Sequence, residues 1–195
     1  MKTGAYMIID KAAKDLELDT KLQDSFGTKA AGIMLDLAAY SIITEGNAAQ
    51  YYPDYAYNHP LFTPDMKCYS DSFLSDFLRS IKEKQRQDFL DQWNAERCKR
   101  ERIYISYDST NKNCQAGDID IVEFGAANVD AGLPIFNYAV GYDVNNREPL
   151  MYEKYSGNIN DVSQLHGQQW VFLYHYGKRN KGFYKQSGKK TERHF

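Results

Sequence analysis

The sequence has few cysteines and no long apolar run, and each shortage excludes a class of protein. Three cysteines, Cys68, Cys98 and Cys114, are spread over 195 residues. An odd number at wide spacing is typical neither of a disulfide framework nor of a four-ligand zinc site, and it fits a reducing compartment. No stretch predicts a membrane span, and charged residues interrupt the start of the chain where a signal peptide needs an apolar block. We therefore expect a soluble, cytoplasmic protein.

Basic charge is scarce over most of the chain. The chain has 24 Lys and Arg residues and 26 Asp and Glu residues. The last thirty positions hold seven of the basic residues and one of the acidic residues. Residues 1–165 therefore carry 17 basic and 25 acidic side chains, a balance of −8. An acidic body is not the usual signature of a nucleic-acid-binding protein, although a local basic patch can still face a phosphate backbone.

The first hundred residues show helical periodicity. Apolar residues at helical spacing predict helices over residues 4–17, 29–45, 70–81 and 84–99, the third capped by Ser70 or Ser72. The second of these helices is apolar around most of its circumference, which predicts a buried core helix. The residues between the first two helices are typical of a short linker. Residues 46–69 contain three prolines that break regular elements, so we predict a long connection whose tyrosines pack onto the domain or stack on bases.

A basic run closes the last predicted helix. It consists of Arg97, Lys99, Arg100 and Arg102. Cations favour the C-terminus of a helix, where they complement its dipole. The same run is the densest basic cluster of the acidic body, so it is also a candidate contact for a nucleic-acid phosphate.

A predicted strand over residues 102–108 ends on Asp108 and organises the second half of the chain. Alternation places Tyr104, Ser106 and Asp108 on one face of this strand. A carboxylate at a strand end, followed by the hydroxyl residues Ser109 and Thr110, is suited to hold a metal ion. The alternative is that Asp108 caps a turn with these two residues.

Three further features follow this strand. Asp118, Asp120 and Glu123 form either a metal-binding acidic cluster or a short strand with a polar edge. Residues 135–142 and 150–155 flank a turn sequence rich in asparagine and predict a β-hairpin. The residues after Gly157 predict the start of a helix.

An aspartate-bearing strand, a hairpin and a helix begin a ribonuclease-H-like sheet, although several α/β folds share that opening. The motifs concerned are Tyr107-Asp108-Ser109-Thr110, Arg147-Glu148-Pro149-Leu150, Gly157-Asn158 followed by Asp161, and the opening Gly4-Ala5-Tyr6. Through these motifs, residues 1–165 resemble the N-terminal part of bacterial insertion-sequence transposases of the Asp-Asp-Glu type. We therefore expect an α+β fold, with a helical region over 1–100, an incomplete ribonuclease-H-like mixed α/β domain over 101–165, and a basic tail over 166–195.

The resemblance implies phosphoryl transfer on the DNA of transposon ends, with three carboxylates that hold two Mg²⁺ ions. Asp108 matches the first of these carboxylates and would contact both metals. Ser109 and Thr110 would shape the turn, and Asn158 and Asp161 would have structural or supporting roles. The partners implied are DNA and either a second copy of the chain or a full-length transposase.

The sequence departs from the family pattern after Asp161, because no aspartate follows it and Glu192 lies in a basic tail. We expect a frameshift or truncation near residue 165; the alternative is a native tail that contacts nucleic acid. With one of three carboxylates, the chain is expected to bind Mg²⁺ weakly or not at all and to be a catalytically inactive transposase fragment. Whether it is an enzyme stays open.

Two other functions remain. One is a non-catalytic protein that binds DNA or pairs with a transposase and inhibits it. The other is an enzyme that uses Asp108 as a phosphoryl-accepting nucleophile. Such enzymes usually carry a second aspartate two residues later, where this chain has Thr110.

Overall fold

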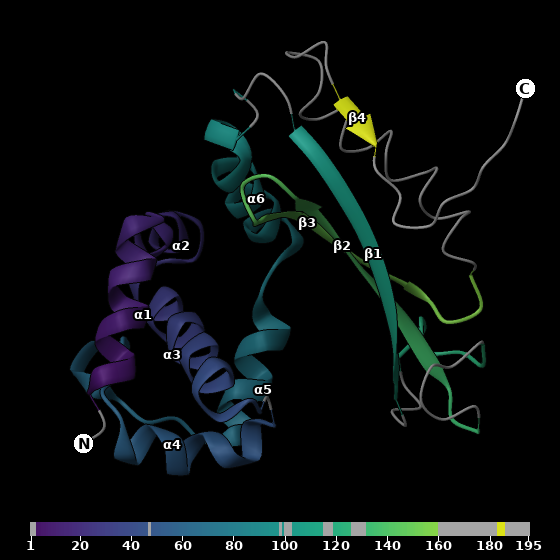
Figure 1. The fold of residues 1–195 in the computed structure, drawn as a ribbon. Coiled ribbons are helices and arrows are strands. Elements are labelled where there is room, and N and C mark those ends of the chain that lie inside the picture. The colour runs from purple at the N-terminus through teal and green to yellow at the C-terminus, as the bar shows by residue number, and fades with distance from the viewer. Residues whose placement is uncertain are drawn as a thin grey trace, which may run out of the picture. The chain divides into compact units, whose positions relative to one another are not determined.

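The computed structural model describes residues 3–46, 48–97, 99, 103–114, 119–125, 132–159 and 183–185. Helices precede strands along the chain, so the fold is α+β, as the sequence predicts (Figure 1). The chain divides into two compact units, Met1–Gln92 and Trp93–Phe195. The elements are α1 (Gly4–Asp15), α2 (Leu18–Phe26), α3 (Thr28–Thr44), the 3₁₀ helix η1 (Ala49–Tyr51), α4 (Tyr52–Asn58), the 3₁₀ helix η2 (Pro64–Met66), α5 (Asp71–Ser80), α6 (Glu83–Arg97), β1 (Ile103–Asn113), β2 (Ile135–Asp143), β3 (Glu148–Ser156) and β4 (Phe183–Lys185).

The helical unit is built around α3. Small and apolar residues cover most of this helix, so it buries side chains in two clusters. One cluster joins Ala31 and Leu35 to Ala13 of α1 and Leu22 of α2, and the other joins α3 to α4 and α5. Figure 1 shows α3 in the middle of these helices. The predicted core helix over residues 29–45 is therefore confirmed.

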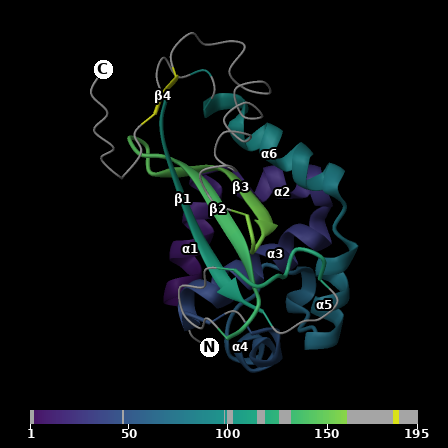
Figure 2. The ribbon, with the colours of Figure 1, turned by 90° about the vertical axis from the view of Figure 1, so that its right-hand side faces the viewer.

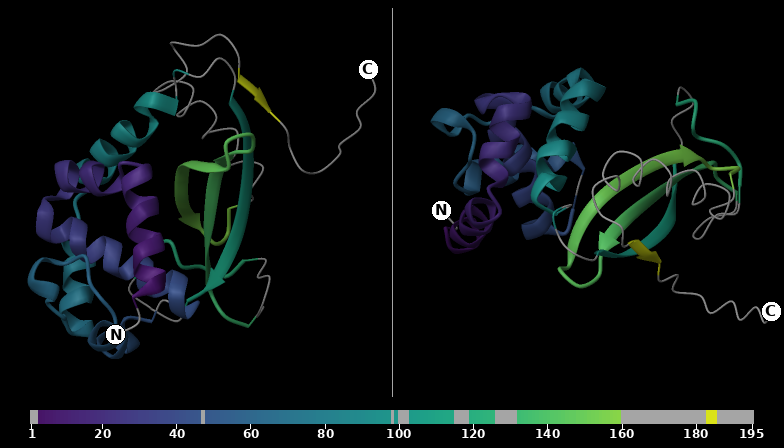
Figure 3. Two further views of the ribbon diagram at one scale, coloured as in Figure 1. Left: turned by 60° about the vertical axis from the view of Figure 1, so that its left-hand side comes forward. Right: turned by 90° about the horizontal axis from the view of Figure 1, so that it is seen from above.

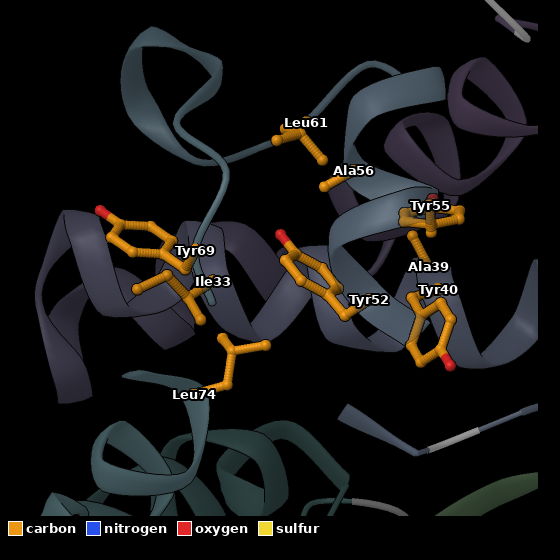
Figure 4. Packing of buried hydrophobic residues seen from close by; sticks show 9 residues of the cluster. All are labelled: Ile33, Ala39, Tyr40, Tyr52, Tyr55, Ala56, Leu61, Tyr69 and Leu74. Atoms are coloured by element: carbon orange, nitrogen blue, oxygen red, sulfur yellow. The ribbon is translucent and has the colours of Figure 1, made fainter. Parts of the chain in front are cut away.

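Tyrosines make up much of the larger cluster (Figure 4). The ring centroids of Tyr40, Tyr52 and Tyr55 lie 5.4 to 6.2 Å apart, the range in which aromatic pairs attract one another. Burial raises the pKa of Tyr55 to about 12 and raises the pKa of Tyr52 further. These two tyrosines of the predicted connection pack into the core, whereas Tyr51 and Tyr57 are exposed.

Two predicted connections contain helices. Leu18, Leu22 and Phe26 recur every fourth residue, which places them on one face of α2, so the predicted linker was wrong. The segment 46–69 contains η1, α4 and η2. Pro53 lies in the first turn of α4, where a backbone N–H is not needed, so this proline starts a helix and does not break one. The remaining helices follow the prediction, and the hydroxyl of Ser70 caps α5 by accepting from the N–H of Phe73 at 3.2 Å.

The strands form one sheet in the order β3-β2-β1-β4. β1, β2 and β3 run antiparallel, and β4 lies parallel to β1. The predicted hairpin is confirmed as β2 and β3, with a register shift at Gly141/Tyr142. Figure 2 shows β1 beside this hairpin, and the view from above in Figure 3 shows the twist of the sheet.

β1 continues well past Asp108. Nine consecutive residues, Ile105 to Asn113, pair with β2 from Asp143 back to Ile135. The prediction of a strand that ends on Asp108 was therefore wrong. The polar residues after Asp108 extend the strand because β2 satisfies their backbone groups, whatever their side chains prefer.

Candidate functional site on strand β1

Asp108 lies in the middle of β1, opposite Val140 of β2, and its side chain is exposed. A carboxylate here keeps its hydration and is accessible to solvent. A side chain in the middle of a strand is held more precisely than one in a loop. The position therefore suits a ligand for a cation or a hydrogen-bond acceptor for a bound molecule.

The face that carries Asp108 combines hydroxyl, aromatic and basic groups. Alternation and the pairing register place Ser106 and Thr110 of β1 on this face, with Tyr138 opposite Thr110. Tyr138 also faces Lys154 of β3, and its ring centroid lies 6.3 Å from that of Tyr152. Burial, followed by the nearby Tyr152, raises the pKa of the Tyr138 phenol. The phenol thus stays neutral and can donate a hydrogen bond.

Ser109 and Thr110 do not shape a turn, because both belong to β1. Ser109 points to the opposite, more buried face, across from Ala139. Thr110 shares the exposed face with Asp108. Of the two residues predicted to shape the turn, the strand therefore brings only Thr110 to the face of Asp108.

Gly157 is required by close packing of two backbone segments. A Cβ atom at this position would clash with the carbonyl oxygen of Ile135 and would lie 2.7 Å from that of Glu123. Asn158 follows and is exposed, and Asp161 lies outside the described residues. The Gly-Asn motif thus combines a glycine that the fold needs with an asparagine that the fold leaves accessible.

Asn137 is a structural residue that the sequence analysis missed. Its buried amide donates to the carbonyl oxygens of Ser156 and Ile159, at 3.0 and 3.1 Å. These bonds hold the turn that presents Asn158. The place of Asn137 among the inward-facing positions of β2 was the one available signal, and it names no partner.

The acidic segment before β2 serves the sheet. Glu123 forms an isolated antiparallel bridge with Ile135, and its carboxylate accepts a hydrogen bond from the hydroxyl of Ser156 at 2.5 Å. Asp120 is exposed, and Asp118 lies outside the described residues. For Glu123, these contacts favour the predicted strand-like edge over a metal ligand.

The two described residues of the basic run, Arg97 and Lys99, form ion pairs within the chain. The guanidinium of Arg97 is buried, pairs with Glu148 and lies 3.6 Å from the centroid of the Trp93 ring. Lys99 pairs with Glu96. Arg100 and Arg102 lie outside the described residues. The burial of Arg97 speaks against a phosphate contact by this residue.

The motif Arg147-Glu148-Pro149-Leu150 attaches α6 to the sheet. Trp93 Nε1–H donates to the Pro149 carbonyl at 2.7 Å, and Asn94 Nδ2–H donates to the Leu150 carbonyl at 2.9 Å. In the described part of the chain, β3 is the edge strand of the sheet. The helix therefore satisfies and covers part of this edge.

Within the described ranges, no group of three or more His, Cys, Asp or Glu side chains is close enough together to hold a metal ion. In the register of the sheet, the hydroxyl residues Ser106 and Thr110 lie on the same face of β1 as Asp108. The described part also contains no helix that is long and apolar enough to cross a membrane. Comparisons with family models, curated proteins and solved structures found no match to this chain.

Proposed function

We propose that the strand unit is a ribonuclease-H-like domain related to those of Asp-Asp-Glu transposases. In this proposal the chain binds DNA, Asp108 is a weak ligand for Mg²⁺, and the chain alone has little or no cleavage activity. One observation carries the proposal: an exposed carboxylate occupies the middle of β1, an inner strand of a sheet with the order β3-β2-β1-β4.

The strand order supports the proposal because a ribonuclease-H-like sheet begins with three antiparallel strands. A fourth strand, β4, runs parallel to β1 on the side away from β2. Reaching that place from the end of β3 requires a crossover connection. Such a crossover is what the resemblance predicts after the hairpin.

The donor groups around Asp108 fit a weak Mg²⁺ site. Mg²⁺ keeps several of its waters and is often held by one or two carboxylates together with phosphate oxygens of the substrate. One carboxylate with two neighbouring hydroxyl residues, Ser106 and Thr110, meets the lower end of that requirement. A bound Mg²⁺ would supply charge stabilisation to a DNA phosphate, and Asp108 would hold it on this face.

Paramagnetic NMR tests the metal site directly. Mn²⁺ replaces Mg²⁺ at oxygen sites and broadens nearby amide signals. We expect broadening centred on β1 around Asp108, its loss in Asp108→Asn, and its retention in the control Asp120→Asn, which changes an exposed aspartate outside the strands. Equal broadening in the wild type and in Asp108→Asn would refute Asp108 as a ligand.

A gel shift with a short fluorescent DNA duplex tests the binding. Electrostatic binding to phosphates weakens as salt rises, so the affinity should fall steeply over a potassium chloride series. If Mg²⁺ strengthens binding in the wild type but not in Asp108→Asn, the result supports the proposal that Asp108 holds Mg²⁺ beside a DNA phosphate. Binding that changes neither with Mg²⁺ nor in Asp108→Asn would favour the second candidate, a non-catalytic DNA-binding protein, to which the lack of a group of three metal ligands in the described ranges also points. No binding at low salt would contradict both.

A further inference from the structure

We propose that a pocket beside the first turn of α3 binds a small organic anion, a molecule with a carboxylate or phosphate head group on a hydrocarbon body. The pocket lies entirely within the helical unit, so the proposal is independent of Asp108. Its volume is about 530 Å³, within the usual range of small-molecule sites. It lies among the end of α2, the start of α3, α5 and the beginning of α6.

The walls of the pocket are mainly apolar. Phe73 and Phe77 of α5 form one side, and Ile33 of α3, Ile81 and Phe26 form others. The ring of Phe26 also packs against that of Phe89, with centroids 6.1 Å apart, which fixes its orientation. An apolar body that displaces water from these walls gains the hydrophobic free energy of the buried area. The walls therefore favour a ligand with a hydrocarbon part.

Two lysines also line the pocket. Lys29 Nζ lies 5.2 Å from the centroid of the Phe73 ring and 5.4 Å from that of Tyr69, so the aromatic rings hold it by cation–π attraction. Lys82 is exposed on the stretch between α5 and α6. In the described part of the chain, neither amine pairs with a carboxylate, whereas several other lysines do. The pocket thus carries positive charge that an anionic head group would neutralise.

The start of α3 adds to this charge. The first hydrogen bond of the helix joins the N–H of Ala31 to the carbonyl of Gly27. The N–H groups of residues 28–30 come before that bond, and these three residues line the pocket. Gly27 provides no side-chain cap, and the first turn has no acidic residue. An anion placed here would be favoured by the helix dipole as well as by the two lysines.

A titration followed by ¹H–¹⁵N NMR tests the proposal with three probes: octanoate, octanol and inorganic phosphate. We expect octanoate to shift the amides of Thr28, Lys29 and Ala30 in a saturable way. Octanol lacks the charge and phosphate lacks the apolar body, so each should bind at least about tenfold more weakly than octanoate, a difference of about 1.4 kcal/mol.

Charge reversal at Lys82, and at Lys84 as a control, provides a matched pair of variants. Lys82→Glu should weaken octanoate binding by about tenfold or more. Lys84→Glu, a control two residues later whose wild-type side chain pairs with Asp88, should leave binding unchanged. Octanol binding as tight as octanoate binding, or equal effects of the two variants, would overturn the anion site. Shifts spread over the whole chain without saturation would overturn the pocket itself.

Discussion

Arg97 and Glu148 form a buried ion pair with two hydrogen bonds, Nε to Oε2 at 3.0 Å and an Nη to Oε1 at 3.1 Å. The pair joins the end of α6 to the first residue of the edge strand β3. Arg97 also donates to the carbonyl of Trp93, at 2.5 Å, and stacks on the ring of the same residue. A guanidinium held by a carboxylate, a carbonyl and an aromatic ring is a structural clamp for the strand unit.

Removing one partner of this pair should destabilise the strand unit strongly. We expect Arg97→Ala to lower its free energy of unfolding by about 3 kcal/mol, because the substitution removes two charge-assisted hydrogen bonds from the poorly solvated Glu148 carboxylate. Native-state hydrogen exchange of the β2 and β3 amides measures this loss. Lys99→Ala breaks an exposed pair with Glu96 two residues later and should change the exchange little.

The double variant Arg97→Ala/Glu148→Ala separates the pair from its surroundings. With both charges removed, the combined loss should be smaller than the sum of the two single losses. Strictly additive losses would show that the two side chains act independently and would contradict the clamp.

Gly157 should not tolerate a methyl group. Alanine there would push against the carbonyl oxygens of Ile135 and Glu123, which are backbone atoms and cannot rotate away. We expect Gly157→Ala to destabilise the strand unit by about 2 kcal/mol or more. Gly4→Ala is the control, because a Cβ atom at Gly4 meets nothing within 4 Å. A thermal or urea transition of the strand unit that is unchanged in Gly157→Ala would contradict the close approach.

Asp36 should make the helical unit less stable as the pH rises. This buried carboxylate accepts from the N–H of Phe62 at 2.6 Å and from the N–H of Thr63 at 3.1 Å. Burial raises its pKa, and these bonds together with that of the Thr63 hydroxyl lower it by a smaller amount. A raised pKa means that the folded state holds the proton more tightly than the unfolded state does. The free energy of unfolding should therefore fall as the pH rises from the ordinary pKa of an aspartate through the raised value.

Asp36→Asn isolates this contribution. Asparagine does not titrate, so the stability of the wild type relative to this variant should decline over that pH range. Urea unfolding at pH values from about 3.5 to about 7 measures the difference. A wild type that gains stability over the variant as the pH rises would show that the hydrogen bonds outweigh burial and would reverse the sign.

Patterns that depend on one face of an element could be predicted from the sequence. The apolar circumference of α3 and the alternation along β2 give their elements within a residue or two, because burial selects the same positions that the pattern marks. Pro53 misled the prediction, since proline breaks the middle of a helix but fits its first turn. The extent of β1 was missed for another reason. Its second half, Ser109 to Asn113, is polar and becomes a strand only because β2 pairs with it.

The candidate site shows the same limit. Asp108 could be found because it is the one acidic residue of β1. Its companions on that face, such as Tyr138 and Lys154, depend on the register of strands that lie far apart in the sequence. The ion pair of Arg97 joins residues 51 positions apart, so the sequence showed two charges but not their partnership.

Asn137 and Asn158 should respond differently to the same substitution. Asn137→Asp replaces an amide that donates to two carbonyl oxygens with a carboxylate that can only accept. We expect it to destabilise the strand unit by about 2 to 3 kcal/mol, because buried carbonyls lose their donor and face a negative charge. The deficit should shrink in acid, where the new side chain regains a proton to donate. Hydrogen exchange at Ser156 and Ile159 reports on this turn.

Asn158→Asp is the matched control in the same turn. Its wild-type side chain is exposed, so the substitution should leave the exchange rates nearly unchanged. If Asn158→Asp nevertheless weakens DNA binding in the gel shift, the exposed asparagine belongs to the binding surface, because its effect cannot pass through stability. Comparable destabilisation by the two substitutions would contradict the assignment of Asn137 as the residue that holds the turn.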